Sequence, residues 1–152
     1  MYKKILIPTD GSPLSSAAAR AGLAFARDAG AEVVGLFVAP GYLYPVYVDV
    51  IPPNYPTQEA HAAMMRKAGE EYLGEIEKGA ADAGLRYSGV TLFSDDPAGK
   101  IVETAKDRQC DLIFIGSHGR SGLRQLLLGS VTSKVLASCH LPVLVYRSPP
   151  EA

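Results

Sequence analysis

Residues 111–130 have the sequence DLIFIGSHGRSGLRQLLLGS, an apolar run that passes into a glycine-rich loop. A short apolar run bounded by turn residues, here Asp111 to Ile115, is typical of a strand buried on both faces of a parallel sheet. Gly129-Ser130 then opens a predicted helix that reaches about Ser138. This stretch predicts a strand, a loop and a helix, which is the repeating unit of α/β proteins.

The same alternation of strand and helix extends over the whole chain. The patterns predict strands at 5–8, 32–39, 87–93, 111–115 and 141–146, and helices at 14–29, from 57 to about 83, from 97, and at 130–138. Ser12-Pro13 and Asp96-Pro97 each combine an N-cap residue with a proline suited to the first helical turn. Gly30 is placed to end the first helix.

These elements predict a mainly parallel sheet with helices on both faces, because the strands are continuously apolar and the helices amphipathic. Right-handed crossovers then give a doubly wound α/β fold. The strand at 87–93 alternates and is less apolar, which suits the edge of the sheet. In such folds, ligands bind outside the carboxyl ends of the strands, where the strand order reverses.

For two parts of the chain, the sequence does not show what they pack against. The predicted helix at 57–83 carries an apolar residue at every fourth position, which predicts a buried stripe: Ala60, Met64, Ala68, Tyr72, Ile76 and Ala80. The preceding segment, 40–56, is rich in proline and in tyrosine (Tyr42, Tyr44, Tyr47 and Tyr55). Its tyrosines either have a packing role, for example on a partner, or cover a ligand.

Size and composition predict a single domain, residues 1–147, followed by a loose tail at 148–152. The net charge of -1 gives no overall field to attract nucleic acid or an anionic membrane. No apolar stretch approaches the roughly 18 residues of a membrane span, so we expect a cytoplasmic protein. Cys110 and Cys139 show no metal-ligand spacing and are expected to be reduced, packed thiols.

Polar residues follow two predicted strands, at 8–12 and at 116–122. Gly116 and Gly119 allow the backbone to turn sharply and to approach a ligand closely. The N–H groups of the helix that begins at Gly129-Ser130 can hold phosphate oxygens, and Arg120 and Arg124 lie between. The alternative is an ordinary helix entry with surface arginines. Neither a GxxxxGK[ST] loop nor a GxGxxG fingerprint occurs.

The segment at 116–146, GSHGRSGLRQLLLGSVTSKVLASCHLPVLVY, resembles the C-terminal signature of the universal stress protein family. Its Gly116, Gly119 and Gly129-Ser130 follow the Gly-x2-Gly-x9-Gly-Ser/Thr spacing of the ATP-binding branch. The opening KKILIPTDGS and the closing LPVLVY are similar to the family as well, so the resemblance covers essentially the whole chain. It implies five parallel strands in the order 3-2-1-4-5.

The resemblance also implies ATP as the ligand, with Mg²⁺ accompanying it. The residues that it places around the nucleotide are Pro8, Thr9, Asp10, Val38, Ile115, Gly116, Gly119, Gly129, Ser130 and Val131. His118 and Arg120, which lie in the same glycine-rich loop, complete the predicted ATP site. By this resemblance, residues 8–10 border adenine and ribose, Val38 meets adenine, and Gly119 and residues 129–131 hold the phosphates. Asp10 would contact ribose or a metal through water, or else form a turn. His118 would be a phosphate contact or a base, or else an ordinary polar loop residue.

The resemblance therefore implies ATP binding in stress adaptation by a homodimer paired through its last strand, where Val143, Leu144 and Val145 would form an apolar edge. No catalytic residue is assigned, because no activated base stands near the loop in sequence. One alternative is a slow Mg²⁺-dependent ATP hydrolase, and another is a cyclic AMP-binding member of the family. A phosphoacceptor domain that uses Asp95 or Asp96 is a third alternative, in which the glycine loop would have no role.

Overall fold

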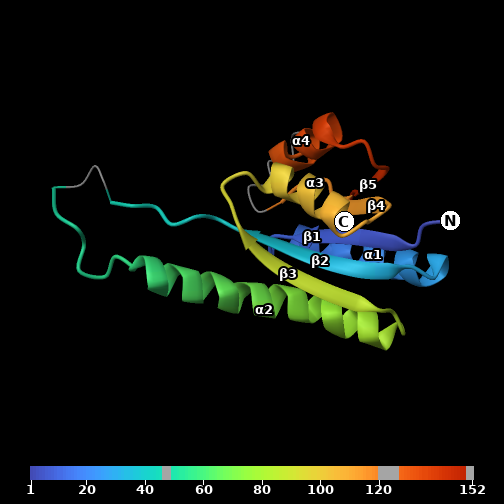
Figure 1. The fold of residues 1–152 in the computed structure, drawn as a ribbon. Helices are drawn as coiled ribbons and strands as arrows, with labels where there is room; N and C mark the ends of the chain where they lie inside the picture. Colours follow the sequence, from blue (N-terminus) through green and yellow to red (C-terminus); the bar gives the residue numbers. More distant parts are fainter. Residues whose placement is uncertain (46–48, 120–126, 150–152) are drawn as a thin grey trace.

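The computed structural model describes residues 1–45, 49–119 and 127–149, which form a single five-stranded sheet with four helices (Figure 1). The elements are β1 (Lys4–Thr9), α1 (Pro13–Ala29), β2 (Glu32–Ala39), α2 (Gln58–Asp82), β3 (Tyr87–Phe93), α3 (Pro97–Asp107), β4 (Leu112–Gly116), α4 (Ser130–Ser138) and β5 (Val143–Tyr146). All four strand pairings are parallel, in the order β3-β2-β1-β4-β5. The predicted doubly wound fold is therefore confirmed.

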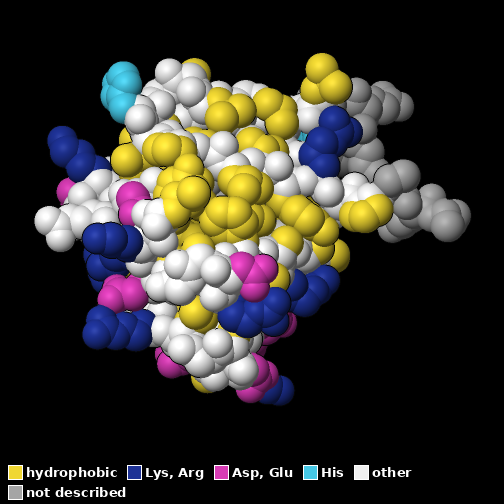
Figure 2. All heavy atoms as spheres, turned by 90° about the vertical axis from the view of Figure 1, so that its right-hand side faces the viewer, with side chains coloured by type: hydrophobic (Ala, Val, Ile, Leu, Met, Phe, Trp, Pro, Cys, Tyr) yellow, Lys and Arg dark blue, Asp and Glu magenta, His cyan; other side chains and the backbone are white. Residues whose placement is uncertain are grey.

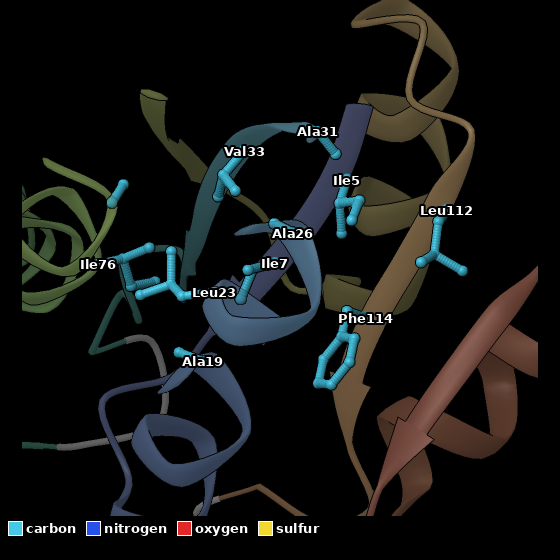
Figure 3. Close-up of a cluster of buried hydrophobic side chains, with 11 residues drawn as sticks. Ile5, Ile7, Ala19, Leu23, Ala26, Ala31, Val33, Ile76, Leu112 and Phe114 are labelled. Carbon is cyan, nitrogen blue, oxygen red and sulfur yellow. The ribbon is translucent and has the colours of Figure 1, made fainter. Parts of the chain in front are cut away.

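The helices cover both faces of the sheet, with α1 and α2 on one side and α3 and α4 on the other. Successive β1 residues consequently pack in opposite directions: Ile5 and Ile7 face α1, and Leu6 faces the α3 side. Leu23 of α1 and Ile76 of α2 lie next to each other over the first face (Figure 3). Burial on both faces explains the continuous apolar runs in the middle of the central strands, such as Ile5, Leu6 and Ile7 of β1.

The helix boundaries follow the predicted capping residues. The Ser12 hydroxyl accepts a hydrogen bond from the N–H of Ser15 and so caps α1. The Asp96 carboxylate accepts from the N–H of Gly99, 3.0 Å away, and caps α3. Gly30 ends α1 with φ at 66°, a left-handed conformation that glycine adopts without strain.

The expected buried stripe of α2 is confirmed only over its second half. Ile76 and Ala80 are fully buried, whereas Met64 is 54% exposed. The first turns of α2 extend beyond the sheet together with the segment that precedes them (Figure 1). Periodicity identifies the apolar side of a helix, but it does not show where the sheet beneath the helix ends.

The tyrosines that precede α2 pack on one another. The ring of Tyr42 lies 5.0 Å from that of Tyr44, 6.2 Å from that of Tyr55 and 5.7 Å from that of His61. The Tyr42 hydroxyl donates a hydrogen bond to the carbonyl of Pro56 at 2.6 Å. Mutual packing is thus what the described tyrosines show, while Tyr47 lies outside the described residues.

The two edges of the sheet differ from each other. The edge strand β3 is only half-buried, as its weaker apolar pattern predicts. The edge strand β5 is four residues long and begins at Val143, two residues later than expected. Hydrophobic side chains gather at the centre of the face shown in Figure 2. In the described part of the chain, no helix has the length and apolarity needed to cross a membrane.

Candidate functional site

The connection from β1 to α1 is held by its own side chains. The Thr9 and Ser15 hydroxyls lie 2.8 Å apart, and Ser15 also accepts from the N–H of Asp10. The N–H of Gly11 donates to Thr9 Oγ1, and the N–H of Ser12 donates to Asp10 Oδ1 at 2.9 Å. Asp10 therefore forms the turn through its Oδ1 atom. This is the turn-forming role predicted as the alternative to contact with ribose or a metal.

The connection from β4 to α4 is fastened at both of its ends. The N–H of Gly129 donates to the carbonyl of Ser117 at 2.7 Å, and Thr132 Oγ1 donates to the carbonyl of Gly116 at 2.8 Å. Ser117 and His118 are buried, with Ser117 Oγ and His118 Nδ1 3.0 Å apart. Both ends of this connection are thus fixed against the carboxyl end of β4.

The glycines of this connection are needed because a side chain there would meet neighbouring atoms, and not because the backbone has a positive φ. Gly116, Gly119 and Gly129 all lack the positive φ that the prediction of sharp turns would suggest. A side chain at position 119 would instead overlap Oδ2 of Asp10, and one at 129 would come within 3.3 Å of the Ser117 carbonyl oxygen. The turn after β1 and the loop after β4 therefore meet at Asp10 and Gly119.

The amino terminus of α4 faces the same region. Its N-cap residue is Gly129, which has no side chain to accept hydrogen bonds from the first helical turn. Ser130 is exposed at the start of this helix, and the first turn carries no acidic residue. Exposed N–H groups and the positive end of a helix dipole attract anions.

These elements enclose a pocket of about 510 Å³ at the carboxyl ends of the strands, where the order reverses between β1 and β4. Every predicted site residue that the structure describes lines this pocket: Pro8, Thr9, Asp10, Val38, Ile115, Gly116, His118, Gly119, Gly129, Ser130 and Val131. Arg120 and Arg124 lie outside the described residues. The pocket lies where the rule for doubly wound sheets predicts a ligand site.

Other residues that line the pocket were not predicted for it. They are Ser15, Leu36, Pro40, Ser94, Asp95, Pro97, Ile101 and Thr132. Asp95 accepts a hydrogen bond from the N–H of Gly41 at 3.0 Å, lines the pocket and is itself exposed. One sequence signal could have found Ser94 and Asp95. They directly follow β3, and the carboxyl ends of parallel strands lie at the same edge of the sheet as the pocket.

The described residues contain no group of three or more histidine, cysteine or acidic side chains arranged to bind a metal ion. Asp10 does lie beside the loop after β4. Mg²⁺ bound to a nucleotide is usually held by one or two carboxylates together with phosphate oxygens and water. Asp10 therefore fits a metal ion that arrives with a phosphate ligand, and does not by itself form a metal centre.

Comparison with known proteins agrees with this architecture. The family model described as "Universal stress protein family" matches residues 1–147. The chain is 36% identical to universal stress protein MJ0531 of Methanocaldococcus jannaschii, across 98% of this chain and 84% of that protein. The solved structure of MJ0577 superposes with a TM-score of 0.75 at 30% identity, covering 99% of each chain.

More distant structures share the fold and hold adenine nucleotides. One is a universal stress protein in complex with cAMP, with a TM-score of 0.62 and 22% identity over 96% of this chain and 97% of that one. Another is the universal stress protein from Archaeoglobus fulgidus in complex with dAMP, with a TM-score of 0.64 and 20% identity over 95% and 97%. From the match over residues 1–147, this chain belongs to the universal stress protein family.

Proposed function

We propose that this protein binds an adenine nucleotide, and specifically ATP, in the pocket at the carboxyl ends of its strands. The observation that carries the proposal is the pocket itself, which joins apolar walls to the uncapped amino terminus of α4. Apolar walls suit a purine base, and the helix terminus suits phosphates. Other proteins of this fold hold cAMP and dAMP.

In the proposed complex, the phosphates lie against Gly119 and the first turn of α4, where Ser130 adds a hydroxyl donor. The ribose lies near Thr9 and Asp10, at the reversal between β1 and β4. Asp10 supports a Mg²⁺ ion on the phosphates through water, because its Oδ2 faces Gly119. Val38 lies on the wall of the pocket that receives the base.

The first experiment is to denature the purified protein, identify any released nucleotide by chromatography, and then titrate ATP, ADP, AMP and cyclic AMP by calorimetry. We expect ATP to bind and Ser130→Ala to weaken that binding by about tenfold, in line with the loss of one phosphate contact. Ser138→Ala, at the other end of α4, is the matched control and should leave affinity unchanged. A protein that binds none of the four nucleotides would refute the proposal.

We also propose that two copies pair through β5. The carbonyl of Pro142 accepts from the N–H of Ile113 in β4, and that of Tyr146 accepts from the N–H of Ser117 directly after β4. The backbone groups of the alternate residues, Val143 and Val145, therefore point to the open edge of the described sheet. An apolar edge strand with unpaired backbone groups is usually covered or paired. Light scattering at micromolar concentration should give a dimer mass.

We infer a role in stress adaptation in the cytoplasm. Family membership supports the role in stress adaptation. The state of the two cysteines supports the cytoplasm. Cys110 and Cys139 are both unpaired thiols, as a reducing compartment would keep them. Detection of the protein in an extracellular or membrane fraction of its cells would contradict this localisation.

A further inference from the structure

The two ends of the pocket differ in chemistry. One end is formed by Gly119 and the start of α4, which favour anions. The other is formed by residues that follow β2 and β3, namely Pro40, Ser94 and Asp95. Strands β3 and β4 are separated by β2 and β1, so their ends stand three strand spacings, roughly 14 Å, apart. An extended ligand that places its phosphates at α4 would point its opposite end toward the ends of β2 and β3, where Asp95 lines the pocket.

The Asp95 carboxylate is oriented by one hydrogen bond and can still accept others. Its Oδ1 accepts the N–H of Gly41 at 3.0 Å, which ties the carboxylate to the segment after β2. Capping of α3 is done by the adjacent Asp96, so Asp95 is not needed to start that helix. An ionised carboxylate offers about four acceptor sites and no donor. Asp95 can therefore accept further hydrogen bonds from a ligand, and it repels phosphate.

The walls beside Asp95 suit a flat aromatic ring. Val38 and Pro40 come from the end of β2, and Pro97 and Ile101 come from the start of α3. A base between apolar surfaces needs a polar group at its edge to fix its orientation and its identity. At this end of the pocket, a carboxylate selects an edge that carries an N–H donor.

We propose that Asp95 is a specificity-determining residue whose carboxylate accepts a hydrogen bond from the 6-amino group of adenine. The same carboxylate disfavours 6-oxo purines, because their O6 is an acceptor that would face another acceptor. This inference rests on the proposed nucleotide binding and adds the feature that selects the base. The adjacent Asp96 is not part of the selection, since its carboxylate caps α3.

The test compares ATP with inosine triphosphate, in which the 6-amino group is replaced by a carbonyl and no exocyclic amine remains. Calorimetric titration of the unchanged protein should give ATP an advantage of about tenfold. Asp95→Asn should reduce this ratio to about threefold or less, because an amide can face either a donor or an acceptor. Asp96→Asn removes the same charge one residue away and keeps a good N-cap residue, so its ratio should stay at the parent's value.

Two results would overturn the inference while leaving ATP binding intact. One is an unchanged ratio of ATP to inosine triphosphate in Asp95→Asn. The other is a change confined to the ratio of ATP to 2′-deoxy-ATP, which would place Asp95 at the ribose. Failure of the parent protein to bind ATP would instead refute the proposed function and, with it, this inference. Circular dichroism and thermal melting of both variants confirm that the fold is kept.

Discussion

The side chain of Asp10 lies against the backbone of Gly119, so that its carboxylate occupies the space a side chain at position 119 would need. The two residues follow the neighbouring strands β1 and β4, and both line the pocket. We expect Gly119→Ala to displace Asp10 and to weaken ATP binding by about tenfold or more, the effect of losing a well-placed polar contact. Calorimetric titration measures this loss.

Gly74→Ala is the control for this substitution. Gly74 lies within α2, and a methyl group there would meet open space. The variant should bind ATP as the parent does, and should gain up to about 1 kcal/mol in free energy of unfolding, because alanine favours the helix. Equal affinities in the two variants would show that contact between Asp10 and Gly119 does not shape the site.

Gly11 should tolerate a side chain less well than Gly84 does. Both have positive φ, at 78° and 70°, so alanine strains the backbone by about 1–2 kcal/mol at either position. At Gly11, a methyl group would also overlap the ring of Tyr72, whereas at Gly84 it would meet nothing. Urea denaturation should therefore show a larger loss of unfolding free energy for Gly11→Ala. Equal losses would contradict the close packing of Tyr72 on this turn.

Val145→Pro should separate the proposed dimer and retain the fold. The N–H of Val145 points away from β4, so proline removes a donor only from the open edge of the sheet. Val145→Thr keeps both that N–H and the branched shape, and serves as the control. Sedimentation or light scattering should give a monomer for the proline variant and a dimer for the threonine variant. A dimeric proline variant would place the interface elsewhere.

Stability should fall as the pH rises from about 9 to 11. Burial among apolar side chains raises the pKa of the Cys110 thiol to about 11. The folded state keeps the proton that the unfolded chain loses first, so the stabilisation is complete below about pH 9 and is lost through pH 11. Chemical denaturation at each pH should show that Cys110→Ala reduces this decline by about 2 kcal/mol.

Two comparisons make the pH measurement specific to Cys110. Cys139→Ala keeps the buried thiol and should show the same decline as the parent protein. Partial burial also raises the pKa of Tyr87, to about 12, but that tyrosine is present in all three proteins and cancels in the comparison. A Cys110→Ala curve parallel to the parent's would show that this thiol does not titrate differently on folding.

Local signals made most of the fold predictable. Ser12, Gly30 and Asp96 mark helix ends through hydrogen bonds and backbone angles that involve only residues close in sequence. The apolar runs of the central strands indicate burial on both faces without reference to a neighbour. The spacing of Gly119 and Gly129 identified the loop of the pocket, because that geometry lies within a single connection.

What the sequence did not reveal depends on contacts between distant segments. Asp95 lines the pocket because β3 ends at the same sheet edge as β1 and β4. Its position directly after β3 was the available signal, but that position points to the pocket only once the strand order is known. Position 119 requires a glycine because the Asp10 carboxylate occupies the space of a side chain, and not because of the backbone φ. Asp10 lies more than a hundred residues earlier in the sequence. Met64 continues an apolar period, yet the sheet does not extend beneath it.

The pocket is assembled from strand ends and helix starts spread from Pro8 to Thr132, so no single strand–helix unit of the chain contains it. A ligand that needs all of these segments binds the folded chain and not the unfolded one. Occupancy would therefore add stability to the whole domain, by about 2.7 kcal/mol at a ligand concentration one hundred times the dissociation constant. The nucleotide supply of the cell would in this way set how often the chain opens to proteases, and hence how long each molecule survives.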